Sequence, residues 1–263
     1  MALDPLFTAT AIEAALAAGR IQRSFFRQPL AIDKKGPIDL VTAADVAVER
    51  DFRARIEARF PSHVVLGEES GQALSSSGYR WIVDPIDGTT NFAHGVALFC
   101  ISIALEIDGA VELGVVYDPI GEELFTAERG GGARLNGLPI HVTPTASLID
   151  ALLVTGFPYS PAHRARQVRV FGALLERTRG VRRLGSAALD LSYVAAGRFD
   201  AFWEEHLHAW DIAAGALIVA EAGGRVTDYQ NGAVDLFKGE ILASNGPVHD
   251  LVRAVVTDPG IPA

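Results

Sequence analysis

The residues best suited to chemistry are two carboxylates that follow an apolar, strand-like run. Trp81-Ile-Val83 leads directly into Asp84 and, three residues later, Asp87. A proline restricts the backbone between the two acids, and Gly88 permits a sharp turn after them. Two charges at the end of a buried strand are costly unless a ligand neutralises them, so this segment predicts a cation site. Thr89 could open a helical turn there, whose free backbone N–H groups would attract a phosphate.

Further blocks place carboxylates at the expected ends of other elements. Glu68 and Glu69 follow a short apolar run, Asp39 and Asp45 flank the start of a helix, and Asp211 begins another. Carboxylates gathered in one place repel and are tolerated only if cations neutralise them. Oxygen ligands suit hard cations, Mg²⁺ before Mn²⁺ or Ca²⁺. Taken alone, Asp45 and Asp211 could instead be N-terminal carboxylates favoured by the helix dipole, and Glu68-Glu69 a solvated loop.

Capping signals predict where the helices start. Asp4-Pro5 is an N-cap followed by proline at the first helical position. Thr42-Ala-Ala-Asp45 is typical of a capping box, and apolar residues then recur at four-residue steps up to Phe60. A helix that is apolar nearly all round is expected from Trp210 to Ala222 and should end at Gly223-Gly224.

Strands dominate the middle of the sequence. They are expected at residues 64–66, 81–83, 98–106, 111–117 and 123–127. The second of them should stop at Asp84-Pro85. The stretch 143–147 is the best candidate boundary between lobes. We therefore expect an α/β (α+β) protein with an N-terminal lobe at residues 1–146 and a C-terminal lobe at residues 147–263, folded as one body.

Composition limits the class of protein. The chain has 263 residues, 49% hydrophobic and 21% charged, which excludes a disordered chain. The single Cys100 excludes an internal disulfide and a cysteine-built zinc site. The net charge of −9 argues against a nucleic-acid partner. No bilayer-spanning run or secretion signal is visible in the sequence, so we expect a cytoplasmic protein with no membrane partner.

The block Asp84-Pro-Ile-Asp-Gly-Thr-Thr-Asn-Phe92 resembles the signature of the inositol monophosphatase family, the Mg²⁺-dependent, lithium-sensitive sugar-phosphate phosphatases. The resemblance covers about Leu6 to Val256, and Thr155-Gly-Phe-Pro-Tyr159 is typical of bacterial members. It implies a layered αβαβα sandwich of the sugar-phosphatase type with the active site between two lobes. Four more blocks match the family in order: Asp39-Leu-Val-Thr-Ala-Ala-Asp45, Gly67-Glu-Glu-Ser70, Arg182-Arg-Leu-Gly-Ser-Ala-Ala188 and Trp210-Asp-Ile-Ala-Ala-Gly215.

The resemblance implies a ligand set for two Mg²⁺ ions, with Mn²⁺ as an alternative and a third, looser ion near Glu68. Glu68, Asp84 and the backbone carbonyl of Ile86 would hold the first ion. Asp84, Asp87 and Asp211 would hold the second, so that Asp84 bridges the pair. Two such ions can clamp the attacking and leaving oxygens of an in-line displacement.

The resemblance also implies the substrate contacts. The backbone N–H groups of Gly88 and Thr89, beside Asp87, would cradle the phosphate. Gly185-Ser186-Ala187, Glu204 and Asp211 would line the polyol.

Thr89, Asp45 and Glu68 are the implied catalytic residues. Thr89, hydrogen-bonded to Asp45, would orient the water activated at the ion that Glu68 holds. No serine or cysteine is paired with a base, so no phosphoryl-enzyme is expected.

The leading interpretation is hydrolysis of myo-inositol monophosphate, a small phosphorylated polyol, by a homodimer. The same chemistry on fructose bisphosphate, histidinol phosphate or a nucleotide phosphate stays open, although a carboxylate at Glu204 favours vicinal hydroxyls over a second phosphate. A regulatory binding protein that acts on transcription complexes is the alternative from another class. His206-Leu-His208 is interpreted as a strand with both histidines on one face rather than as a zinc pair.

Overall fold

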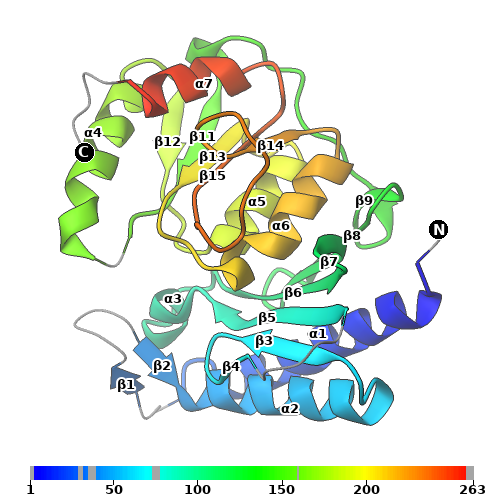
Figure 1. Ribbon diagram of the computed structural model, residues 1–263. Coiled ribbons are helices and arrows are strands. Elements are labelled where there is room, and N and C mark those ends of the chain that lie inside the picture. Colours follow the sequence, from blue (N-terminus) through cyan, green and yellow to red (C-terminus); the bar gives the residue numbers. More distant parts are fainter. Residues whose placement is uncertain (1–2, 29–31, 35–39, 73–77, 159, 259–263) are drawn as a thin grey trace.

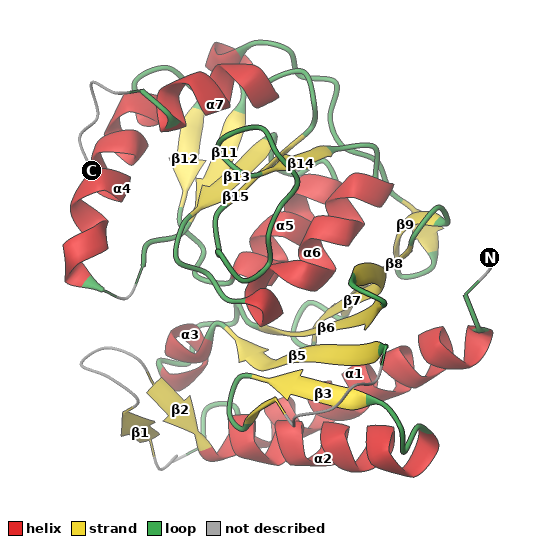
Figure 2. Cartoon of the chain, viewed as in Figure 1, coloured by secondary structure: helices red, strands yellow, loops and turns green. Residues whose placement is uncertain are grey.

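The computed structural model describes residues 3–28, 32–34, 40–72, 78–158 and 160–258, and its elements stack in layers (Figure 1). Helices α1 (Pro5–Phe25) and α2 (Ala43–Arg59) cover the outer face of an eight-stranded sheet. Helices α5 (Ala187–Ala195) and α6 (Ala209–Glu221) form the middle layer, and α4 (Pro161–Leu175) and α7 (His249–Val256) cover a five-stranded sheet. The predicted α/β layered sandwich is confirmed (Figure 2).

The larger sheet runs in the order β10-β9-β8-β7-β6-β5-β3-β4, and only its β3–β5 pair is parallel among the described strands. A separate ribbon pairs β1 (Ile32–Lys34) with β2 (Leu40–Thr42). The strands of the larger sheet are β3 (Val64–Gly67), β4 (Gly71–Gln72), β5 (Tyr79–Asp87), β6 (Cys100–Ile107), β7 (Ala110–Asp118), β8 (Glu123–Glu128), β9 (Gly132–Leu135) and β10 (Leu138–Pro139).

The smaller sheet runs in the order β12-β11-β13-β15-β14. Its first strand along the chain begins at Leu152, whereas the last strand of the larger sheet ends at Pro139. The lobe boundary predicted at 146/147 falls between these two points and stays a prediction. The remaining elements are η1 (Leu148–Asp150), β11 (Leu152–Thr155), β12 (Gly180–Arg182), β13 (Ala201–Glu204), β14 (Arg225–Thr227), β15 (Ile241–Ser244) and α3 (Thr89–Ala93).

The predicted helix starts are confirmed. The Asp4 carboxylate accepts the N–H of Leu6 at 2.9 Å as the N-cap of α1. Thr42 and Asp45 form the expected capping box of α2. The apolar helix expected from Trp210 is α6, and it ends one residue earlier than predicted.

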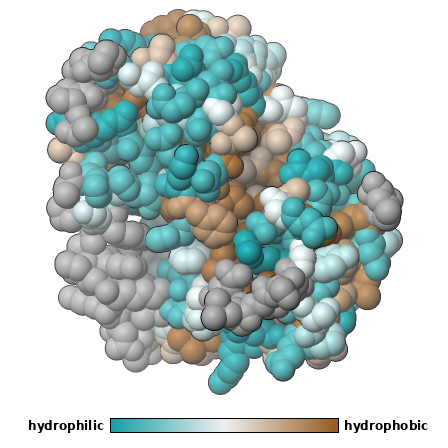
Figure 3. Space-filling model, in the orientation of Figure 1, coloured by the Kyte–Doolittle hydropathy of each residue, from teal (hydrophilic) through white to brown (hydrophobic). Residues whose placement is uncertain are grey.

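Alternation along β5 determines which way its acids point. Trp81 and Val83 pack into the apolar core under α1 and α2, whereas Ile82 packs into the core shared with α5 and α6. Because successive strand residues face opposite sides, Asp84 follows Ile82 and faces α6. The face in Figure 3 is mostly hydrophilic, with a group of hydrophobic residues near its middle.

Two sequence predictions about element ends are wrong. Strand β5 does not stop at Asp84-Pro85 but continues to Asp87. Its register with β6 shifts between Asp84 and Asp87, so Pro85, which has no backbone N–H, does not have to donate a hydrogen bond to β6. His206 and His208 do not lie on a strand, because β13 ends at Glu204. His206 has a left-handed φ of 63°, and His208 is the N-cap residue of α6. Among the described residues, no helix is both long and apolar enough to cross a membrane.

Helix α6 lies unusually close to both of its neighbours because glycines remove side chains from the contacts. A Cβ added to Gly114 on β7 would lie 2.7 Å from the Ala214 carbonyl oxygen of α6. A Cβ added to Gly215 would lie 2.6 Å from the Leu191 side chain on α5. These approaches fix the height of α6, and therefore of Asp211, above the larger sheet.

We expect Gly114→Ala to lower the free energy of unfolding by about 1–3 kcal/mol, because the added methyl meets helix backbone that cannot rotate away. Gly172→Ala is the matched control: it lies within α4, and a Cβ there meets nothing within 4 Å. That control should gain roughly 0.5–1 kcal/mol from helix propensity. Urea unfolding compares the two. Equal stability changes would show that α6 is not held by this contact.

Candidate active site

A cavity of about 290 Å³ contains almost all of the predicted site residues. Only Asp45 of that set is absent from its wall, because it is fully buried one side chain behind it. The residues brought together at the cavity wall come from both lobes: Glu68, Asp84, Ile86, Asp87, Gly88, Thr89, Gly185, Ser186, Ala187, Glu204 and Asp211.

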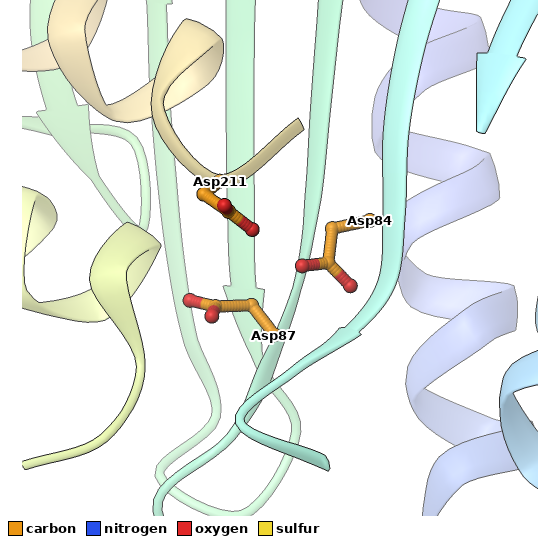
Figure 4. A group of neighbouring side chains, drawn as sticks. All are labelled: Asp84, Asp87 and Asp211. Carbon is orange, nitrogen blue, oxygen red and sulfur yellow. The ribbon is translucent and has the colours of Figure 1, made fainter. Parts of the chain in front are cut away.

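Three carboxylates form the tightest acidic group. Asp84 and Asp87 on β5 and Asp211 in the first turn of α6 each offer an oxygen, and these oxygens lie within 4.8 Å of one another. Figure 4 shows the three side chains converging. They match the residues that sequence resemblance implied for the second ion. Glu68 and Ile86 line the same cavity but lie outside this group.

The electrostatics of the group fit a divalent cation. Burial, followed by the charges of Glu68, Asp87 and Asp211, raises the pKa of Asp84 well above its usual range. Burial and the charge of Asp87 do the same to Asp211. Such a set is unfavourable as three free anions, but it provides an all-oxygen site for a hard cation of the Mg²⁺ type.

Asp87 joins the end of β5 to the start of α5. Its Oδ2 accepts hydrogen bonds from the Ser186 hydroxyl at 2.6 Å and the Ala188 N–H at 2.7 Å, and its Oδ1 accepts the Ala187 N–H at 3.3 Å. Burial raises the pKa of Asp87 to about 6, although these bonds act to lower it. The thiol of Cys100 also donates to Oδ2 at 3.8 Å, and burial raises its pKa, which suits an unreactive core thiol.

The loop that carries Glu68 is held by Glu49, a residue that sequence reasoning missed. The Glu49 carboxylate, 2% exposed, accepts the N–H groups of Glu69 at 2.8 Å and Ser70 at 3.2 Å, and also the Ser70 hydroxyl. Arg53 donates to it at 2.9 Å. The four-residue spacing of Glu49 and Arg53 on α2 signals an ion pair, but nothing local signals contact with the Glu68 loop.

Thr89 connects the cavity to Asp45. The Thr89 hydroxyl lies 2.9 Å from the Ile86 carbonyl oxygen and 3.3 Å from Asp45 Oδ1, and can donate to either. Asp45 Oδ2 accepts the N–H and hydroxyl of Thr42 at 2.8 and 2.6 Å. Asp45 is therefore both a helix-capping carboxylate and a hydrogen-bond partner of Thr89. The two interpretations of Asp45 from the sequence, a helix cap and a site residue, are compatible. Asp39, from the same block, lies outside the described residues.

The turn after Asp87 requires glycine. Gly88 has a φ of 99°, and a Cβ there would lie 2.9 Å from the Leu98 carbonyl oxygen. Asn91 fixes the turn across the lobes, since its side-chain amide donates to the carbonyls of Leu98 and Leu184, both at 2.8 Å. The helical turn expected at Thr89 is confirmed as α3.

The cavity wall also contains Glu204 and three residues that were not predicted: Gly156, Arg183 and Asp190. Any Cβ at Gly156 would collide with the Glu204 carboxylate, so this glycine makes room for the acid. Burial raises the pKa of Glu204 to about 8, against the lowering effect of Arg183. The resemblance to known sequences provided no signal for Arg183 and Asp190 beyond their place in or next to a matched block.

We expect Asp84→Asn to raise the melting temperature of the metal-free protein. In the present structure the Ile86 N–H donates to Asp84 Oδ1 at 2.9 Å, and the oxygen of the new amide can still accept this bond. The substitution also removes one repelling charge. Relief of roughly 1–3 kcal/mol corresponds to a few degrees. The increase in melting temperature that Mg²⁺ gives the wild type should be smaller in the variant, because a cation that binds the folded protein more weakly stabilises it less.

Differential scanning fluorimetry in EDTA and in excess Mg²⁺ measures both effects. Glu57→Gln, which removes an exposed acid from α2, is the control for net charge and should change neither value. An Asp84→Asn protein that keeps the full Mg²⁺ shift would contradict a cation site at this position.

The buried acid Glu204 predicts a pH dependence of stability. Its carboxyl ionises near 4.5 in the unfolded chain and near 8 in the folded protein. Between these values the folded state holds more protons, so stability falls as pH rises through this window. Glu204→Gln cannot ionise. The melting temperature of the metal-free variant, relative to wild type, should therefore increase by several degrees from pH 5 to pH 8; a constant difference would show that Glu204 ionises normally.

Comparison with known proteins agrees with this arrangement. A sequence profile described as the inositol monophosphatase family matches residues 5–258. The chain is 46% identical to the Nus factor SuhB of Pseudomonas aeruginosa, over 89% of this chain and 90% of the relative. It is 43% identical to an inositol-1-monophosphatase of Rhizobium meliloti, over 94% and 95% of the two chains. The crystal structure of the extragenic suppressor protein suhB from Bartonella henselae superimposes with a TM-score of 0.93 at 40% identity, covering 96% of this chain and 99% of that one. The chain therefore belongs to the inositol monophosphatase family of phosphatases.

Proposed function

We propose that the protein hydrolyses the phosphate monoester of a small polyol, myo-inositol monophosphate foremost, with Mg²⁺ as its cofactor. The observation that carries the proposal is one cavity whose wall contains a group of three carboxylates, two buried and one partly buried, and a further acid, Glu204. The first group suits cations that bind phosphate, and the second suits hydroxyl groups. Mn²⁺ would satisfy the same oxygen ligands.

The residues have distinct roles in this proposal. Asp84, Asp87 and Asp211 would hold one ion, and Glu68 and the Ile86 carbonyl, with Asp84, another. Divalent cations bound there supply positive charge for the phosphate and activate a water.

The chain itself provides a route for the proton of the attacking water. The Thr89 hydroxyl can accept that proton while it donates its own toward Asp45 Oδ1, 3.3 Å away. Burial raises the pKa of Asp45 to about 6, close to neutrality, so this carboxylate can hold the transferred proton. The phosphate would be oriented by the backbone at Gly88 and Thr89, which begins α3 beside Asp87.

The names of relatives favour two activities at similar identity, "Inositol-1-monophosphatase" and "Nus factor SuhB". The acidic cavity favours hydrolysis as the activity of this chain, and an interaction of the second kind would be additional to it. The homodimer, lithium sensitivity and cytoplasmic location stay predictions.

Release of inorganic phosphate from a substrate panel tests the proposal. The panel contains myo-inositol 1-phosphate, p-nitrophenyl phosphate, fructose 1,6-bisphosphate, histidinol phosphate and a nucleoside monophosphate, each with Mg²⁺ and with EDTA. We expect Mg²⁺-dependent turnover with the highest kcat/KM for the inositol ester.

Thr89→Ala should lower kcat by about 10²–10⁴-fold and leave KM nearly unchanged, because the hydroxyl acts in the transition state. Preference for another ester would change the substrate, and full activity in EDTA would overturn the mechanism.

A further inference from the structure

The polyol side of the cavity contains a second acid that the proposed reaction does not use. Asp190, on α5, is 1% exposed and lines the cavity together with Glu204 and Arg183. Its Oδ1 atom is fully buried and has no hydrogen-bond partner in the described part of the chain. Buried carboxylate oxygens are almost always bonded, so an unbonded one in a residue that lines a cavity points to a partner supplied from that cavity.

The neighbours of Asp190 do not supply that bond. Arg183 is close enough to influence Asp190 and Glu204 electrostatically, yet among the described residues it forms no ion pair within 4.0 Å with either acid. Its guanidinium lies instead beside Gly185, where any Cβ would collide with it. Glu204 is itself an acid and raises the pKa of Asp190, after the larger effect of burial.

Rigid surroundings keep the two acids in place. Glu204 ends β13 opposite Ile241, and its carboxylate lies against Gly156. Gln167 on α4 fixes that segment, because its amide donates to the Thr155 hydroxyl at 2.7 Å and to the Gly156 carbonyl at 2.9 Å. Asp190 lies one helical turn after Ser186, the N-cap residue of α5 that donates to Asp87. The acid is therefore on a rigid element tied to the phosphate side of the cavity.

We propose that Asp190 is a specificity-determining residue whose unpartnered carboxylate oxygen accepts a hydrogen bond from a hydroxyl of the alcohol part of the substrate. This inference rests on the proposed function, because it needs a polyol ester in the cavity. Asp190 and Glu204 together would then read two hydroxyls of the polyol. An ester whose alcohol has no hydroxyl would gain nothing from Asp190.

Two substitutions and two esters test this role. Asp190→Leu replaces both acceptor oxygens by methyl groups in the same branched shape, and Asp190→Asn keeps one acceptor oxygen. Leaving a buried hydroxyl of the substrate without its acceptor costs roughly 5–150-fold in an equilibrium or rate ratio. We expect Asp190→Leu to lower kcat/KM for myo-inositol 1-phosphate by at least about 10-fold, with Asp190→Asn intermediate. Both variants should hydrolyse p-nitrophenyl phosphate within about 2-fold of wild type, and both should melt at or above the wild-type temperature.

Ser192→Ala is the matched control. Ser192 is fully buried on the same helix, and its hydroxyl donates to the Ala188 carbonyl at 2.7 Å outside the cavity wall. This change should not alter the ratio of kcat/KM for the two esters.

The possible results separate the two proposals. If the variants lose activity equally on both esters, or melt lower and lose both, Asp190 is structural and this inference is overturned. If the wild type prefers the inositol ester and Asp190→Leu keeps that preference, Asp190 reads no hydroxyl, and the proposed function survives without it. If the wild type hydrolyses the aryl ester but no polyol ester, both the substrate class and the role of Asp190 are wrong.

Discussion

The concentration of negative charge between the end of β5 and the first turn of α6 is the constraint on which the rest of the structure depends. One carboxylate oxygen from each of Asp84, Asp87 and Asp211 lies within 4.8 Å of the other two, and the pKa of each residue is raised. Helix N-termini compensate for part of that charge, because the positive end of the helix dipole and its free N–H groups favour anions. Asp211 is the third residue of α6, and Asp87 accepts the first two N–H groups of α5. Asp45, just behind the cavity, is the third residue of α2.

The layered fold follows from that convergence. Helices α5 and α6 can direct their first turns at the end of β5 only if they lie between the two sheets, where glycines allow α6 to approach closely. Hydrogen bonds across the lobes surround the site. Asp87 binds Ser186, Asn91 binds the Leu184 carbonyl, and the Ser102 hydroxyl donates to the Trp210 carbonyl at 3.0 Å. Packing of α5 and α6 between the two sheets and formation of the site are therefore coupled, and a bound cation would stabilise both.

The parts of the site that form within a few neighbouring residues can be predicted from the sequence. The capping box at Thr42, the glycine after Asp87 and the apolar run of α6 each depend on a few neighbouring residues, and each prediction is confirmed. The sequence resemblance placed Glu68, Asp84, Asp87, Glu204 and Asp211 in one site, and the structure brings these five acids to one cavity. The role of each residue in that cavity stays a prediction.

What the sequence could not reveal depends on long-range packing. Glu49 contacts a loop some twenty positions away, and Glu204 influences Asp190 electrostatically only because α5 packs beside β13. The strand prediction for His206 and His208 failed because alternating side chains carry no information on where β13 leaves its partner β15. The early stop assigned to β5 failed for a related reason, since a register shift can carry a strand past proline.

Coupling between Mg²⁺ and inorganic phosphate tests the central claim most directly. If the carboxylates hold cations that in turn bind the phosphate, each ligand must raise the affinity for the other by the same factor. Isothermal titration of the wild-type protein with phosphate, in EDTA and in saturating Mg²⁺, measures this factor without turnover. The account predicts that phosphate binds at least about 10-fold more tightly with Mg²⁺, a coupling of roughly 1.4 kcal/mol. Equal phosphate affinity in EDTA and in Mg²⁺ would contradict it.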